Sequence, residues 1–188
     1  GRDFAAASEI YDRLLLVAKQ PVVMNQAAYV AAFMGDRQKA EQLASGAEAA
    51  SPNEPQFADT HGEIAYFFGD YAEAARLFEK AAGMNPAFLN GLAVWKAAMS
   101  AQMAGDVNRA AGHFRQFADL RTKAGAPNTL LLEAIWDWQC GRKEGAYDKL
   151  QRAANSSERG KALFLYALMA LNQRDFATAE RTRRDIDP

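Results

Sequence analysis

The sequence predicts an all-α protein made of stacked helix pairs, and three observations support this prediction. Ala is abundant and β-branched residues are sparse, which favours helices over strands. The six prolines fall between periodic apolar segments, where proline starts or follows helices. A two-residue motif also recurs along the chain, at Gly35-Asp36, Gly69-Asp70, Gly105-Asp106 and Gly141-Arg142.

The recurring motif marks the turn inside each predicted helix pair, at intervals of 34, 36 and 36 residues. Gly ends a helix easily because it adopts the left-handed conformation, and the Asp beside it can cap the next helix. A small residue one turn later lets two antiparallel helices approach closely. That residue is Ala40, Ala74, Ala110 or Ala146. Each repeat is therefore predicted to be a helix hairpin that stacks on its neighbours.

The same phase covers the whole chain and predicts its elements in order. Residues 1–19 match only the second helix of a pair. Five complete pairs follow, at residues 21–53, 55–87, 88–126, 127–157 and 158–188. Together they predict about eleven helices in a single domain.

Composition excludes several classes of protein. The chain has 188 residues, enough to form one hydrophobic core. Its formal net charge is −1, so its overall electrostatic field does not favour binding to nucleic acid or to an anionic membrane. No apolar run approaches the roughly 20 residues needed to span a bilayer. The one cysteine, Cys140, excludes a disulfide framework and a Cys-rich zinc site. The basic cluster near Arg183 is flanked by acidic residues and is interpreted as a solvated helix face.

The block from Pro55 to Pro86 carries the most detailed pattern. Its spaced residues are Gly62, Gly69-Asp70-Tyr71, Ala74, Phe78, Ala81 and Pro86. In this order they resemble the tetratricopeptide repeat family, whose helix pairs repeat about every 34 residues. The resemblance implies a right-handed α-solenoid and extends, less completely, over the full chain. Some positions depart from the family pattern. The usual aromatic residue is replaced by Ala44, Leu150 and Arg183 in three of the repeats, the usual small residue by Phe117, and the turn glycine by Arg174.

The resemblance also implies a binding groove, because in this family the first helix of each pair lines a concave surface. The corresponding positions here are Asn25, Tyr29, Asp59, Glu63, Tyr66, Trp95, Met99, Gln102, Leu131, Ile135, Trp138 and Phe164. We interpret Trp95 and Trp138 as candidate anchors, because large aromatic residues are favoured in interfaces. Core packing is the competing interpretation for aromatic residues at helical spacing, above all for Phe33 and Phe67.

The chemistry of the partner is constrained by the same positions. A well-known groove of this family holds a C-terminal carboxylate with Lys, Arg and Asn, but the corresponding places here include Asp59, Glu63 and Trp95. We therefore expect an apolar or amphipathic helix, or an extended segment with a basic residue near Asp59 and Glu63.

Catalytic and metal-binding patterns are lacking in the sequence, so we expect no enzyme activity, cofactor or metal. The two histidines, His61 and His113, belong to different repeats. Residues Asp59, His61 and Glu63 are two apart and do not share one face of a helix. Asp137, between two tryptophans, is predicted either to be a buried acid or to reach solvent.

The predicted function is a protein-protein interaction module that binds a peptide or protein segment of unknown identity. The alternative is a structural scaffold or oligomerisation segment of a larger multidomain protein, or a regulatory appendage of an enzyme. The apolar residues between Ile10 and Val17 favour the scaffold or oligomerisation alternative, which includes a homodimer formed through exposed terminal helices. The opening at Gly1-Arg2 has the character of a cut within a longer, bacterial-looking protein. We expect a cytoplasmic location by default, and a periplasmic one if the parent chain carries a signal.

Overall fold

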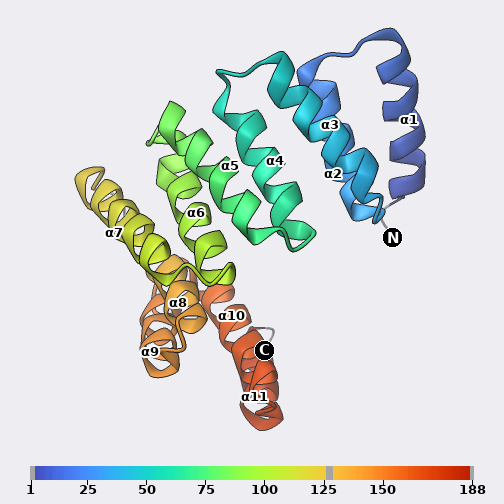
Figure 1. Ribbon diagram of the computed structural model, residues 1–188. Helices are drawn as coiled ribbons and strands as arrows, with labels where there is room; N and C mark the ends of the chain where they lie inside the picture. Colours follow the sequence, from blue (N-terminus) through green and yellow to red (C-terminus); the bar gives the residue numbers. More distant parts are fainter. Residues whose placement is uncertain (1–2, 126–128, 187–188) are drawn as a thin grey trace. The chain divides into compact units, whose positions relative to one another are not determined.

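The chain is all-α, as predicted. The computed structural model describes residues 3–125 and 129–186, and these form eleven α-helices and one short 3-10 helix without a β-strand (Figure 1). The predicted boundaries at Gly1, Pro127 and Pro188 lie outside the described residues. Within the described ranges, no helix is long and apolar enough to cross a membrane.

Residues 1–123 form one compact unit, here called unit 1. Each of its helices packs on the next one along the chain, and α2 also packs on α4. The small 3-10 helix η1 (Phe88–Gly91) precedes α6. The α-helices are α1 (Phe4–Val17), α2 (Pro21–Phe33), α3 (Arg37–Ala50), α4 (Pro55–Phe67), α5 (Tyr71–Met84), α6 (Leu92–Met103) and α7 (Val107–Lys123).

Residues 124–188 form a second compact unit, unit 2. Its helices also pack successively, α8 on α9, α9 on α10 and α10 on α11. They are α8 (Leu130–Gln139), α9 (Lys143–Ala154), α10 (Arg159–Asn172) and α11 (Phe176–Ile186). The interpretation of both units as parts of one solenoid domain stays a prediction.

The turns inside the helix pairs have the conformation that their sequence predicts. The φ angles lie between 76° and 86° at Gly35, Gly69, Gly105 and Gly141. Asp36 and Asp106 each accept a hydrogen bond from the backbone N–H of the third residue of the following helix. Asp70 differs: it makes no capping bond, and its carboxylate pairs with Arg37 of the preceding repeat instead. The predicted capping role is therefore wrong for Asp70.

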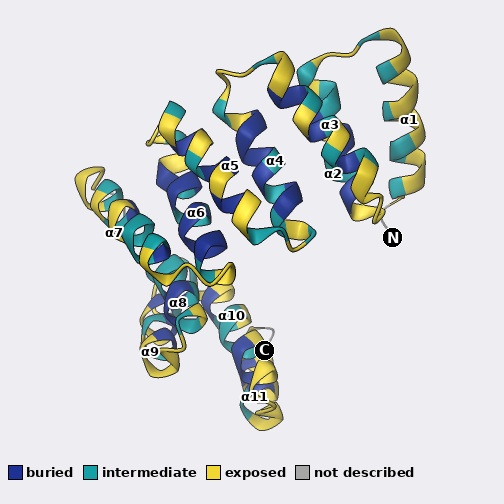
Figure 2. Ribbon diagram, viewed as in Figure 1, coloured by how far each residue is buried: buried dark blue, intermediate teal, exposed yellow. Residues whose placement is uncertain are grey.

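The small residues at the predicted helix contacts are fully buried. Ala40, Ala74, Ala110 and Ala146 have no solvent exposure. Figure 2 shows buried residues along the facing sides of the paired helices. A close approach occurs at Gly62, where an added Cβ would lie 2.8 Å from a ring carbon of Phe78. The absence of a side chain on Gly62 thus lets the aromatic ring of α5 press against the backbone of α4.

Phe117 departs from the repeat pattern because other repeats have a small residue at its place. Its ring is nonetheless buried. It lies near the entry to α6, 3.7 Å from the position that a Cβ on Gly91 would take. The chain reaches this point through Leu89, Asn90 and Gly91, which all have positive φ angles. The larger ring is therefore accommodated together with an unusual turn.

Ala74 provides a test of the helix packing. Replacing it with Leu should destabilise the fold by about 1–3 kcal/mol, because the added side chain overpacks a contact between two helices. The measurement is the free energy of unfolding in denaturant. Ala72→Leu on the exposed side of the same helix is the matched control and should be nearly neutral. Equal effects of both substitutions would contradict the packing described here.

Arg174 provides a test of the turn conformation. It has a φ angle of 61°, at the place where the other repeats have the turn glycine. A residue with a Cβ is strained there, so Arg174→Gly should stabilise the chain by about 0.5–1 kcal/mol after the entropy of Gly is counted. Arg174→Ala keeps the Cβ and should give no such gain. If both variants gain equally, the loss of charge and not the backbone is responsible.

Candidate protein-binding surface

Each first helix of the pairs in unit 1 carries residues of the predicted site on one of its sides. On each helix these residues are three or four apart, except for the adjacent Trp95 and Lys96, which places them on one side of that helix. We call this surface the first-helix face. Its residues are Asn25, Tyr29 and Phe33 on α2, Asp59, Glu63 and Phe67 on α4, and Trp95, Lys96, Met99 and Met103 on α6.

A polar cluster lies in the middle of the first-helix face. The Tyr29 hydroxyl donates a hydrogen bond to the Glu63 carboxylate and lies 3.2 Å from the Thr60 hydroxyl. Lys96 Nζ lies 2.7 Å from Oδ2 of Asp59 and also pairs with Glu63. We call these five residues, from three helices, the polar cluster. It ties each first helix of unit 1 to the next.

Two acceptor oxygens in and beside the polar cluster are not matched by a donor of the described residues. Burial raises the pKa of Asp59, although Lys96 opposes this shift. Burial, followed by the hydrogen bond to Glu63, also raises the pKa of Tyr29. The Oδ1 atoms of Asp59 and Asn25 are both buried, and neither has a hydrogen-bond partner among the described residues. Unmatched acceptors of this kind weaken a fold, because the lost contact with water is not replaced.

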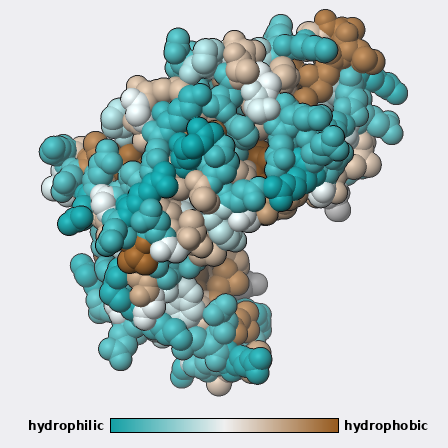
Figure 3. All heavy atoms as spheres, viewed as in Figure 1, coloured by the Kyte–Doolittle hydropathy of each residue, from teal (hydrophilic) through white to brown (hydrophobic). Residues whose placement is uncertain are grey.

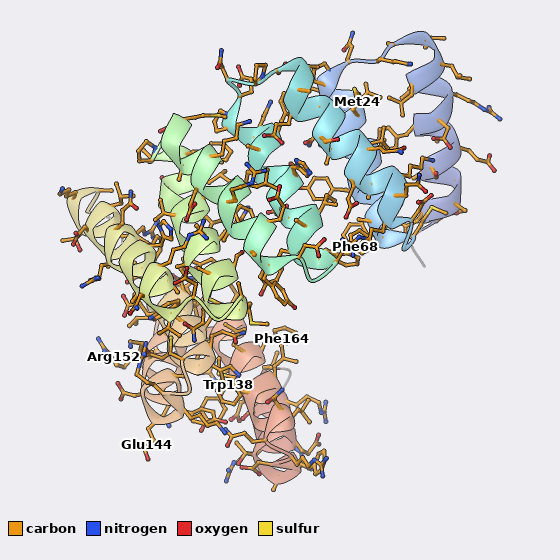
Figure 4. All side chains as sticks on the ribbon, in the orientation of Figure 1. Met24, Phe68, Trp138, Glu144, Arg152 and Phe164 are labelled. Carbon is orange, nitrogen blue, oxygen red and sulfur yellow. The ribbon has the colours of Figure 1, made fainter. Side chains whose placement is uncertain are left out.

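An aromatic row lies one helical turn from the polar cluster. Phe33 and Phe67 meet edge to face with ring centroids 6.1 Å apart, and each side chain is 55% exposed. Phe4 stacks on Phe33 at 5.2 Å, and Phe68 meets Phe67 at 5.1 Å. Figure 4 labels Phe68 at the end of α4. Both Phe33 and Phe67 thus contact neighbouring rings and still present much of their surface to solvent.

The predicted site residues of unit 1 differ in accessibility. Asn25, Asp59 and Met99 are buried, so they offer little surface to a partner. The partly buried ones are Tyr29, Glu63, Tyr66, Trp95 and Gln102. Their role as binding residues stays a prediction.

The predicted site residues of unit 2 lie on α8 and α10. Leu131, Ile135 and Trp138 are partly buried, and Phe164 is 57% exposed. The Trp138 ring meets that of Tyr147 with centroids 6.0 Å apart, and the Lys143 ammonium lies 5.7 Å from its centre. Trp138 and Phe164 are labelled in Figure 4.

Asp137 is a buried acid, which decides between the two alternatives left by the sequence. Its carboxylate accepts hydrogen bonds from Arg142, 2.7 Å away, and from Lys149. Burial would raise the pKa of Asp137, but Lys149 and Arg142 outweigh it and hold the pKa below its usual value. The residue therefore joins α8 to α9.

His61 points away from the two acidic residues beside it in sequence. Its Nδ1 atom lies 2.6 Å from the carboxylate of Glu48, which also pairs with Lys80. Asp59 and Glu63 instead meet Lys96. His61 therefore lies on a different side of the helix from Asp59 and Glu63, as their spacing of two residues predicts. No group of three or more His, Cys, Asp or Glu side chains within the described residues could hold a metal ion.

Two apolar surfaces lie at the outermost helices of the described chain. On α1, Leu16 and Val17 are more than four-fifths exposed, and Figure 3 shows a hydrophobic patch over that end of the helix. Between α10 and α11 lies a shallow hollow of about 420 Å³. Its largest apolar lining residues are Phe164, Leu168, Leu171, Phe176 and Ile186.

Lys96 provides a test of the polar cluster. Lys96→Met should destabilise the fold by about 3–5 kcal/mol at neutral pH, because it leaves the buried Asp59 carboxylate without its cation. Burial raises the pKa of Asp59 in the folded chain above its unfolded value, so the charged carboxylate costs stability only above the unfolded pKa. The loss should therefore shrink as the pH falls through the raised folded pKa and reach its minimum at about pH 4.

The measurement is the free energy of unfolding of variant and wild type at matched pH values. A double variant that adds Asp59→Asn should recover much of the loss at neutral pH. A loss that does not change with pH would show that the buried charge is not its cause.

Comparison with solved structures identifies the fold. A tetratricopeptide repeat protein from Parabacteroides merdae is similar over 98% of this chain and 71% of its own, with a TM-score of 0.77 and 17% identity. MamA is similar over 84% and 90% (TM-score 0.61, 13% identity), and PilF of Pseudomonas aeruginosa over 96% and 81% (TM-score 0.63, 15% identity). No protein-family model and no curated protein sequence matches the chain. The residue pattern and these structures together show that the chain has the tetratricopeptide repeat fold.

Proposed function

We propose that this chain is a protein-interaction module, not an enzyme, and that it binds a segment of a partner on the first-helix face. The observation that carries the proposal is the exposure of Phe33 and Phe67. More than half of each ring is open to solvent, although both belong to an aromatic row beside charged groups. Exposed aromatic side chains next to polar groups are typical of protein interfaces.

The polar cluster supports this proposal by fixing the face before a partner arrives. Hydrogen bonds and ion pairs connect α2 to α4 and α4 to α6 through Tyr29, Glu63 and Lys96. Side chains that are already ordered lose less conformational entropy when a partner binds. The similar solved structures establish the fold alone, and a fold does not specify a function. The proposal therefore rests on this surface.

A second candidate function is a scaffold that associates through the outermost helices. It is favoured by the exposed apolar residues of α1 and by the hollow between α10 and α11. Exposed apolar patches of this kind are common at contacts between proteins. Association through them would leave the first-helix face unused.

The experiment compares protein capture by the wild type with capture by a Phe33→Ala/Phe67→Ala variant. We expect the variant to lose its specific partners by about tenfold or more, since central aromatic residues carry much of an interface's energy. Captured proteins are quantified by mass spectrometry, and folding is checked by circular dichroism. Phe176→Ala, which removes an even more exposed phenylalanine from unit 2, is the matched control.

Unchanged capture by the Phe33→Ala/Phe67→Ala variant would place binding on another surface. If neither protein captures a partner and the wild type self-associates in light scattering, the scaffold function replaces the proposal. In that case Leu16→Glu should reduce the self-association.

A further inference from the structure

The first-helix face carries an uncompensated negative charge. Asp59 and Glu63 together contribute two carboxylates, and Lys96 contributes one ammonium. Within the part of the chain that the structure describes, no donor reaches Oδ1 of Asp59. Asp59 and Lys96 are largely covered, whereas about a third of the Glu63 side chain reaches solvent. A partner therefore meets the negative charge of the polar cluster at Glu63.

An apolar platform lies within reach of this carboxylate. Phe67 follows Glu63 by four residues on α4, which places the two side chains about 5–6 Å apart on one face. Phe33 follows Tyr29 in the same way, and the Phe33 and Phe67 rings are in contact. The partner group that fits has a cationic head for Glu63 and a flat or apolar part for the rings.

The chain itself uses this combination one residue further on. The Arg37 guanidinium lies 5.7 Å from the ring centre of Phe68 while it pairs with Glu41 at 2.8 Å and with Asp70. Phe68 is in contact with Phe67. A guanidinium held between a phenyl ring and a carboxylate is thus already part of the surface beside the first-helix face.

Other partner groups fit less well. Lysine is a compact and strongly hydrated charge that makes less use of a ring than arginine does. A carboxylate or phosphate would meet Glu63 with like charge. A purely apolar side chain would remove water from Glu63 without replacing its hydrogen bonds.

We infer that the first-helix face recognises an arginine side chain of the partner segment, with the guanidinium on Glu63 and its flat side on the Phe33–Phe67 pair. The inference rests on the proposed function and specifies the chemistry of the partner. Arginine supplies several N–H donors in a planar group that pairs with carboxylates and stacks on aromatic rings.

The test is a selection of random dodecapeptides displayed against the whole 188-residue chain. We expect the selected peptides to be enriched in arginine beside apolar residues. A selected peptide is then synthesised with arginine and with citrulline, its neutral isostere, at the enriched position. The arginine peptide should bind about tenfold more tightly, which is the usual scale for a hydrogen bond that involves a charged group.

Variants of the protein then locate the contact. Glu63→Gln should weaken the arginine peptide about tenfold and remove its advantage over the citrulline peptide, whereas Glu54→Gln, an exposed carboxylate outside the cluster, should change neither. Loss of the arginine–citrulline difference cannot come from partial unfolding, since unfolding would weaken both peptides alike.

The outcomes separate this inference from the proposed function. Peptides that lose binding in the Phe33→Ala/Phe67→Ala variant but lack arginine, or show no coupling to Glu63, overturn the inference and leave the proposed function in place. Enrichment of acidic peptides also overturns the inference. A selection that yields no peptide, or only peptides indifferent to both sites, overturns the inference and the proposed function together.

Discussion

Two antiparallel helices can pack as closely as α4 and α5 do only where the residues between them are small, and the rest of unit 1 depends on this contact. Phe78 presses against the backbone of Gly62, and Ala74 is fully buried beside it. Close packing fixes the angle and spacing of each pair, and therefore also the spacing of the first helices. Only with that spacing can Tyr29 reach Glu63 and Lys96 reach Asp59 from different repeats.

Local features of the fold were predictable from the sequence because local chemistry determines them. A turn that needs a positive φ angle selects glycine, and a close helix contact selects alanine, so both can be found by their spacing. Arg174 was recognisable as a departure from that pattern, and it nonetheless adopts the left-handed conformation and the backbone hydrogen bonds of the turn glycines. Asp70 has the residue type of a helix cap, and only the position of Arg37 in the neighbouring repeat explains why it forms an ion pair.

The sequence indicated which residues share a helical face, but not the electrostatics of that face. The periodicity placed Asp59 and Glu63 on one face, where a basic residue of the partner was expected. It did not show that Lys96, in the next repeat, compensates one of the two charges. The burial of Met99 and the exposure of Phe33 were equally inaccessible to periodicity, because both depend on how neighbouring helices cover each other. A residue's helical face can be derived from the sequence, whereas its accessibility requires the packed structure.

The bonds that link neighbouring repeats have a consequence for the modularity of this chain. Tyr29 pairs with Glu63, Arg37 with Asp70 and Glu48 with Lys80. Each of these pairs connects one repeat to the next. Repeat proteins are often treated as strings of interchangeable parts, since each repeat touches only its neighbours. Here the complementary partners are distributed in a fixed order. Shuffling or duplicating whole repeats would keep the backbone geometry and separate these partners, so the order of the repeats is itself part of what the sequence encodes.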